Sequence, residues 1–339
     1  MPKKELFKTL IALTQAELPF ERIEREIVLP VKPDGIITIP GVRRAGKSSL
    51  LMLVANKLIA SGVNPKQILW INFDDERLAG MQAEELDQVL TAYREMFPDV
   101  DLKDVYMFFD EIQNITGWDL FVLRVFKSYC PHVYVTGSNA KMLSSEISTA
   151  LRGWTLDYEV LPLSFDEYCR FTGVEARGYL ESDQAKRHAA MESYIYGGAF
   201  PQVVLTPDAS TKLKRLQGYF NTMLFRDMVE RHKIKNVEGL RYFLKRLMLN
   251  LSKTTSINAI FNDMRSSGAV VNKDDLYNWA DWAVEAYMFV RYPKYSASML
   301  KENQSLRKYY VIDTGMRQTV LMPQSTDKGK LLEIIVALD

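Results

Sequence analysis

Apolar and polar residues in the first half of the chain form blocks typical of an α/β protein. Short apolar runs rich in β-branched or aromatic residues occur at 35–40, 67–73, 105–109 and from 132 onward. Longer stretches with apolar residues at helical spacing lie between them, at 47–62, 80–98 and 116–129. Strands that are apolar throughout are buried on both faces of a parallel sheet, so this alternation predicts a parallel sheet covered by helices.

The loop after the first strand, "PGVRRAGKSS", contains the pattern G-x-x-x-x-G-K-S. A strand before it and a helix after it are the context that a phosphate-binding loop requires, although a purely structural turn is the alternative. Backbone N–H groups at the helix N-terminus favour an anion. Lys47 would reach the β- and γ-phosphates, and Ser48 would bind Mg²⁺. The predicted ATP-binding residues are Gly41, Arg43, Arg44, Ala45, Gly46, Lys47, Ser48 and Ser49.

The apolar run 105–109 ends in Asp110 and Glu111. Ligands bind at the carboxyl ends of strands in open α/β sheets. We therefore predict that Asp110 is a Mg²⁺ partner and that Glu111 polarises the attacking water. The alternative is that the two acids only cap the next helix.

The strand that begins at 132 leads into "TGSNA". From its end Asn139, or otherwise Ser138 or Thr136, could contact the γ-phosphate or the water, unless this stretch is a plain turn. The run 67–73 lies between the loop and the acidic pair in the sequence and indicates an additional strand. The class of P-loop ATPases with such a strand uses a carboxylate beside the metal-binding acid for hydrolysis.

Composition excludes several classes of protein. Net charge is +1, no apolar run approaches the ~20 residues of a membrane span, and the N-terminus has no signal-peptide core. The two cysteines, Cys130 and Cys169, form no metal-binding pattern. We expect a cytoplasmic protein with no membrane partner.

The second half is mostly helical, with helical stretches at about 209–232 and 237–253. Three helices followed by β-rich segments resemble a winged helix. Residues 212–246 carry ten Lys or Arg and three acids, which is compatible with a phosphate-binding stripe or with solvated helix faces. The stretch 271–290 has one Lys and four acids, so DNA binding is possible but a protein contact is favoured.

Several motifs together resemble a prokaryotic AAA-type P-loop ATPase family with a C-terminal region of uncharacterised role. They are "GVRRAGKS", "FFDEIQNITGW", "TGSNA" and "YEVLPLSFDEY", followed by "YIYGGAFPQVVL" and "KYYVIDTGMR". The resemblance implies nucleotide binding and ATP hydrolysis, and its matched residues are Lys47, Ser48, Asp110, Glu111 and Asn139. Where the family often has an arginine directly after a glycine, this chain has Trp154. Arg152, before that glycine, is therefore the candidate sensor of the γ-phosphate.

The resemblance and the pattern divide the chain into four regions. They are a P-loop AAA-type domain (1–165), a helical region (166–235), a winged-helix-like domain (236–325) and the start of an incomplete C-terminal domain (326–339). In the resembled family this last segment often opens a nuclease-like fold. Here Glu333 alone could not assemble a hydrolytic metal site, so we expect no cleavage of nucleic acid. The apolar face of the final helix would dock on the winged-helix region or on another copy of the chain.

Two functions fit these features. The first is a Mg²⁺-dependent ATPase whose hydrolysis rearranges the P-loop and C-terminal domains. The second is a nucleotide-gated switch that binds ATP or ADP and recruits a protein partner, or self-associates, with negligible turnover. Glu111 favours the first, because a switch does not need a carboxylate that polarises water.

Overall fold

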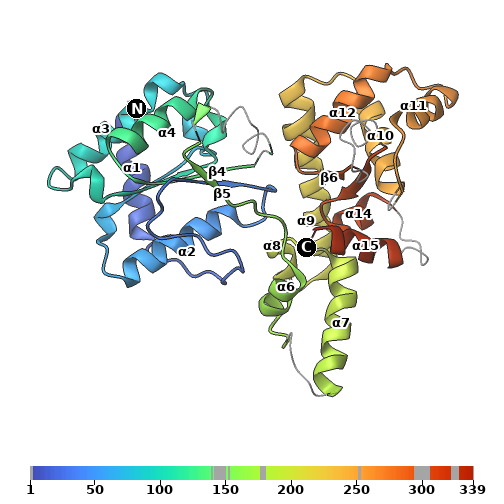
Figure 1. Cartoon of the computed structure of the whole chain (residues 1–339), viewed down its shortest axis with the longest axis horizontal. Helices are drawn as coiled ribbons and strands as arrows, with labels where there is room; N and C mark the ends of the chain where they lie inside the picture. The colour runs from blue at the N-terminus through green and yellow to red at the C-terminus, as the bar shows by residue number, and fades with distance from the viewer. Residues whose placement is uncertain are drawn as a thin grey trace. The chain divides into compact units, whose positions relative to one another are not determined.

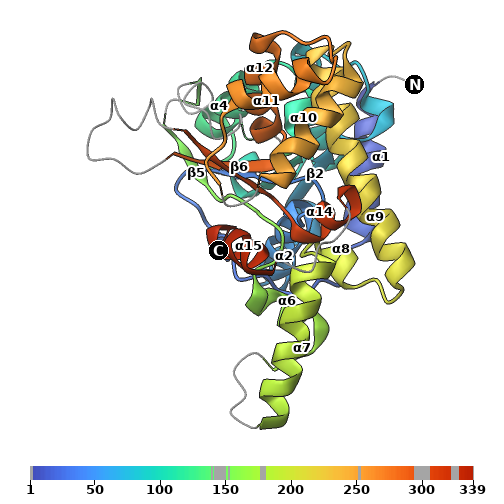
Figure 2. The same ribbon diagram turned by 90° about the vertical axis from the view of Figure 1, so that its right-hand side faces the viewer.

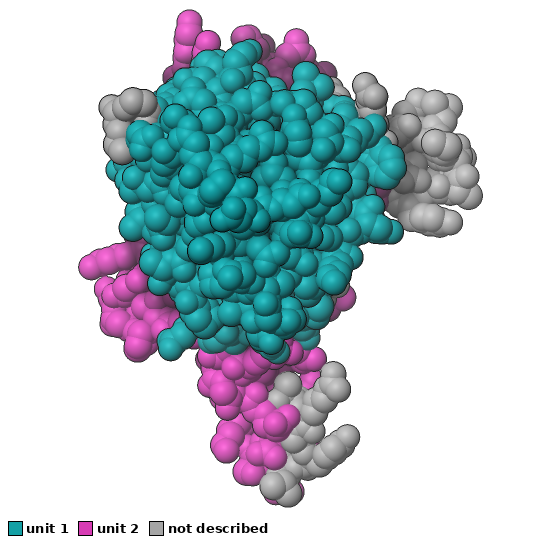
Figure 3. Space-filling model, turned by 90° about the vertical axis from the view of Figure 1, so that its left-hand side faces the viewer, with its two compact units in different colours: residues 1–41, 46–160 teal, residues 42–45, 161–339 magenta. Residues whose placement is uncertain are grey.

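The computed structural model describes residues 3–138, 140, 150–151, 153–175, 181–250, 253–293, 306–321 and 328–338. Two compact units divide the chain (Figure 3). The first comprises Met1–Gly41 and Gly46–Val160, and the second comprises Val42–Ala45 and Leu161–Asp339. The four-residue segment inside the predicted phosphate loop is thus grouped with the C-terminal half of the chain.

A five-stranded parallel sheet forms the centre of the first unit, which confirms the predicted α/β class. Its spatial order is β2-β3-β4-β1-β5. The strands are β1 (Ile36–Pro40), β2 (Ile68–Asn72), β3 (Tyr106–Asp110), β4 (His132–Gly137) and β5 (Thr155–Asp157). In space it is β4 that separates the loop strand β1 from the acidic strand β3, whereas β2, which separates them in sequence, pairs only with β3 and lies at the sheet edge. Because all strands run in one direction, the ends of β1, β3 and β4 meet at one edge.

Alternate side chains of β3 pack on opposite faces of the sheet, as the two-residue period of a strand requires. Met107 and Phe109 join one apolar core with α1 (Lys3–Ala16), α3 (Asp87–Met96) and α4 (Trp118–Ser128). Phe108 points the other way, with ring centroids 5.3 Å from Trp70 and 4.8 Å from Tyr134. The helix that follows the loop, α2 (Lys47–Ala60), covers this second face (Figure 1).

The second unit is mostly helical. Side-chain caps begin several of its helices: the hydroxyl of Ser164 accepts from the Glu167 N–H, and Asp208 accepts from the Thr211 N–H. None of the helices in the described ranges combines the length and the apolar character needed to cross a bilayer. The elements are α6 (Phe165–Thr172), α7 (Glu181–Gly197), α8 (Pro201–Val204), α9 (Ala209–Thr222), a π-helix (Met223–Glu230), α10 (Val237–Leu249), α11 (Ile257–Ser266), α12 (Lys273–Glu285), β6 (Phe289–Tyr292), β7 (Lys308–Val311), α14 (Thr314–Val320) and α15 (Lys328–Leu338).

Helices α10, α11 and α12 are followed along the chain by the antiparallel pair β6–β7, and the winged-helix assignment of this region stays a prediction. The final helix α15 contacts α7, α14 and β7 (Figure 2). Glu333 accepts hydrogen bonds from Lys308 Nζ (2.9 Å) and Tyr310 Oη (2.7 Å), so its carboxylate is engaged by the protein itself. No group of three or more His, Cys, Asp or Glu side chains in the described part of the chain is placed to hold a metal ion.

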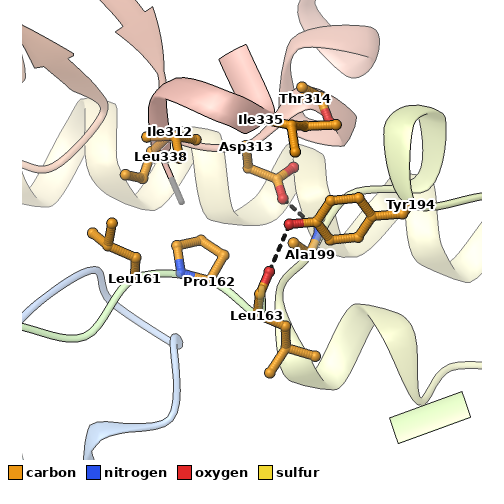
Figure 4. Close-up of a pocket in the computed structure, with 10 residues that line it drawn as sticks. All are labelled: Leu161, Pro162, Leu163, Tyr194, Ala199, Ile312, Asp313, Thr314, Ile335 and Leu338. Atoms are coloured by element: carbon orange, nitrogen blue, oxygen red, sulfur yellow. Dashed lines mark hydrogen bonds between the residues drawn. The ribbon is translucent and has the colours of Figure 1, made fainter. Parts of the chain in front are cut away.

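A buried carboxylate joins two motifs that are more than 100 residues apart in the sequence. Asp313 of "VIDTG" is 2% exposed and accepts from the backbone N–H of Ala199 in "GGAFP" at 2.6 Å (Figure 4). It also accepts from the backbone N–H of Met316 at 2.6 Å. Gly198 has φ +83°, and a Cβ there would lie 2.6 Å from Asp313 Oδ1, so only glycine fits. The cavity beside this contact has a volume of about 30 Å³, room for a single water. Asp313 is therefore a structural cross-link.

Burial raises the pKa of Asp313, while the backbone N–H groups that it accepts from oppose that shift. We expect Asp313→Asn to lower the free energy of unfolding by about 2 kcal/mol, because the amide would direct its own N–H toward a backbone donor and leave that donor unpaired. Urea unfolding followed by circular dichroism measures the change. Asp208→Asn is the matched control: Asp208 also caps a helix but is exposed, and asparagine caps about as well as aspartate. Equal losses in the two variants would contradict the assignment of Asp313 as a cross-link.

Candidate functional site

The loop between β1 and α2 passes very close to Val160, the last residue of the first unit. Gly41 forms an isolated parallel bridge with Val160, and a Cβ at Gly41 would lie 2.2 Å from the Val160 carbonyl oxygen. No other residue fits at this position. After Gly46 the chain enters α2, whose 14 residues make its first N–H groups and its dipole available at the loop.

Lys47 folds back over the loop and is only 3% exposed. Its Nζ donates to the Gly41 carbonyl oxygen (3.1 Å) and to Ser138 Oγ (2.7 Å), and it lies 3.4 Å from Glu111 Oε1. A buried ammonium group is tolerated only when it is paired and hydrogen-bonded. These three partners come from the ends of β1, β4 and β3, so Lys47 joins the three strand ends.

Asp110 is 3% exposed at the end of β3. The hydroxyl groups of Thr136 and Ser48 donate to its carboxylate. Burial and the nearby Glu111 raise the pKa of Asp110, and the two hydroxyl groups and the charge of Lys47 act against this rise. The two residues predicted to bind Mg²⁺, Ser48 and Asp110, are thus in direct contact.

Glu111 has a left-handed backbone (φ +53°), a conformation that costs a non-glycine residue roughly 1–2 kcal/mol. Its N–H donates to Thr136 Oγ1 at 2.9 Å, so one threonine engages both acids. Ser138 Oγ donates to Glu111 Oε1 and Gln113 Nε2 donates to Glu111 Oε2, each at 2.6 Å. These contacts hold the strained turn and fix the direction of the carboxylate.

The two arginines of the loop have protein partners within the second unit. The Arg43 guanidinium donates to Asp227 of the π-helix through Nη2 (3.0 Å) and Nε (3.2 Å), and Asp227 is 1% exposed. The Arg44 guanidinium lies 4.6 Å from the ring centroid of Tyr219. Ala45 is buried, and Ser49 lies half-buried in the first turn of α2. The side chains of Arg43 and Arg44 therefore both contact residues of the second unit.

Two predicted residues, Asn139 and Arg152, lie outside the described residues, so their proposed contacts with the γ-phosphate stay predictions. Thr136 and Ser138, the alternative candidates at the end of β4, both contact Glu111 directly. The sequence did not single out Gln113. Its only signal was an amide two residues after Glu111 in "DEIQ".

Comparison with known families places two domains on the chain. Residues 33–169 match an AAA domain, and residues 188–327 match a domain of unknown function, DUF8612. The uncharacterized protein MJ1544 of Methanocaldococcus jannaschii is 33% identical over 342 positions, covering 99% of this chain and 74% of the relative. An uncharacterized protein of Haemophilus influenzae is 27% identical over 328 positions, covering 96% of this chain and 79% of the relative.

Among solved structures, Cdc6p of Pyrobaculum aerophilum aligns over 99% of this chain and 94% of its own. The identity is 12% and the TM-score is 0.32.

Thr136→Val would remove one hydroxyl that serves both acids and keep the shape of the side chain. We expect about tenfold more Mg²⁺ to be needed for tight nucleotide binding, since a hydrogen bond to a charged group is worth roughly 1.5–3 kcal/mol. Titration of Mg²⁺ against a fluorescent ATP analogue measures this. Thr38→Val is the control, because Thr38 is also fully buried in a strand and donates to Asp157, outside the cluster around Lys47. If both variants respond alike, Thr136 has no special role in organising the acids.

Proposed function

This chain belongs to the same family as MJ1544 of Methanocaldococcus jannaschii and carries an AAA domain in its first half, and from that premise we propose that it is a Mg²⁺-dependent ATPase. We further propose that hydrolysis changes the arrangement of the P-loop and C-terminal regions. The observation that carries the proposal is the cluster of Lys47, Glu111 and Asp110 at one sheet edge. In this proposal Lys47 binds phosphate, Asp110 binds the metal ion, and Glu111 accepts a proton from the attacking water.

The side chains and backbone N–H groups of this cluster fit a nucleoside triphosphate with its metal ion. Lys47 and the first N–H groups of α2 suit the phosphate oxygens, and the contact between Ser48 and Asp110 supplies two oxygen ligands of the kind that Mg²⁺ prefers. When bound, Mg²⁺ supplies positive charge that stabilises the phosphates during transfer. Ser48, Asp110 and the phosphate oxygens together would hold it.

The contact between Lys47 and Glu111 suggests how binding would prepare catalysis. Among the described residues Lys47 Nζ contacts Gly41, Ser138 and Glu111, and a phosphate oxygen would compete with the Glu111 carboxylate for the same ammonium group. Transfer of Lys47 to phosphate would leave Glu111 oriented by Ser138 and Gln113 and available to accept a proton from water. Substrate binding would thereby activate the base.

The second candidate is a nucleotide-gated switch with negligible turnover that recruits a protein partner or a second copy of the chain. It is favoured by the pairing of Arg43 with Asp227, because nucleotide at the loop would act on the segment that carries this ion pair. Asp227 lies in a π-helix, an element frequent at functional sites. Phosphate release by the purified protein, with and without a partner, separates the two candidates, since a switch would release almost none.

We expect Lys47→Ala to abolish tight nucleotide binding, because backbone N–H groups cannot replace the one mobile ammonium group of the loop. Titration with a fluorescent ATP analogue measures the affinity. Lys57→Ala is the matched control, a lysine near the other end of the same helix and exposed to solvent. Unchanged affinity of the Lys47 variant would show that nucleotide binds elsewhere.

We expect Glu111→Gln to keep ATP affinity but to lower the hydrolysis rate by about 10²–10⁴-fold, the usual effect of losing a positioned general base. The amide keeps the shape of the side chain and loses the charge that accepts a proton. Single-turnover phosphate release measures the rate, and Glu76→Gln on the exposed surface of the same unit is the control. Hydrolysis at the wild-type rate would remove Glu111 from the mechanism.

A further inference from the structure

Gln113 lies in the short 3-10 turn Ile112–Asn114 that follows Glu111. The two ends of its carboxamide are in different situations. Nε2 donates to Glu111 Oε2 at 2.6 Å, whereas Oε1 is buried and accepts no hydrogen bond from any residue that the structure describes. A buried acceptor without a donor costs about 1–3 kcal/mol, so this arrangement calls for an explanation.

The direction of the carboxamide follows from chemistry. The two ends of an amide have nearly the same shape, but the reversed orientation would bring Oε1 against Glu111, and a carboxylate only accepts hydrogen bonds. Oε1 therefore points away from the oxygen that Nε2 contacts. Bond lengths within the amide keep it within about 5 Å of Glu111 Oε2, close enough for one small donor to reach both side chains.

We propose that Gln113 is a catalytic residue that holds the attacking water together with Glu111. This inference rests on the proposed ATPase function. The water would donate one hydrogen to Gln113 Oε1 and the other to the Glu111 carboxylate. Its oxygen then forms a bond to the terminal phosphorus, and the bond from that phosphorus to the bridging oxygen breaks, with the electron pair kept by the leaving ADP. The proton from the water passes to Glu111.

The adjacent amide has a different role in the fold, which makes it a useful control. Asn114 Nδ2 donates to the Phe73 carbonyl oxygen (3.2 Å) and to Asp74 Oδ1 (3.3 Å), so Asn114 fixes the end of β2 to the turn. If Gln113 were only structural, its replacement would resemble that of Asn114. If it holds water, its replacement would affect hydrolysis and leave the fold intact.

The test compares Gln113→Met, Gln113→Glu and Asn114→Ala with the wild-type chain. Methionine keeps the length of the side chain and removes both the donor and the unpaired acceptor. For each protein we would measure the melting temperature, ATP affinity, single-turnover phosphate release against pH, and the tightening of ADP binding by aluminium fluoride, which mimics the phosphoryl group in transfer.

We expect Gln113→Met to lower the hydrolysis rate by about 10–100-fold, to keep ATP affinity within about twofold and to lose most of the fluoride-dependent tightening. Its melting temperature should stay close to that of the wild type, because the lost contact with Glu111 is offset by removal of the buried acceptor. Gln113→Glu should also lower the hydrolysis rate, since a carboxylate cannot donate a hydrogen bond to Glu111 as Nε2 does. Asn114→Ala should lower the melting temperature and leave the fluoride effect intact.

A wild-type rate and an intact fluoride effect in Gln113→Met would overturn this inference alone. So would a loss of rate that only parallels a loss of stability, as in Asn114→Ala. If the wild-type chain itself shows neither phosphate release nor fluoride-dependent tightening, the proposed ATPase function fails and this inference fails with it.

Discussion

The buried ammonium group of Lys47 is the feature on which the rest of the candidate site depends. It contacts the Gly41 carbonyl oxygen, Ser138 and Glu111, one from each of three neighbouring strand ends. Such a charge is stable in the interior only if each strand end delivers its partner. The parallel register of β1, β4 and β3 brings the three strand ends, and with them the three contacts, to the ammonium group. A phosphate oxygen would bind the same ammonium group. The stability of the nucleotide-free site and the affinity for nucleotide would therefore both depend on the charge of Lys47.

Thr136 positions the two acidic residues of the site, Asp110 and Glu111. Its hydroxyl engages the Asp110 carboxylate and the Glu111 backbone together, and the left-handed backbone of Glu111 is held by that contact. Strained turns at functional sites persist where the surroundings over-determine them. Here the constraint turns the Glu111 carboxylate toward Lys47 and Ser138, while Asp110 stays with Ser48.

Asp313 and Gln113 differ in how far their hydrogen-bonding groups are satisfied. Asp313 is as buried as Asp110, but backbone donors from two segments satisfy its oxygens, and the adjoining cavity is the size of one water. Gln113 has one end engaged and the other buried without a donor in the described structure. A group of the first kind stabilises a fold. A group of the second kind needs an explanation, and for Gln113 we propose that a water completes the network.

The sequence by itself predicted strands β1 to β4 of the first unit and the helices between them, because these depend on local periodicity. It also predicted a phosphate-binding loop from glycine, lysine and serine at fixed spacing. It also indicated Lys47, Asp110 and Glu111, since a strand that ends in acids after such a loop is a local pattern. Only the tertiary structure decided that β4 lies between β1 and β3, that Thr136 serves both acids, and that Gln113 and Asp313 differ in their partners. The pairing of Arg43 with Asp227, 184 residues apart, has no local signal at all. These contacts join residues distant in sequence, and their geometry exists only once the strands have paired and the helices have packed.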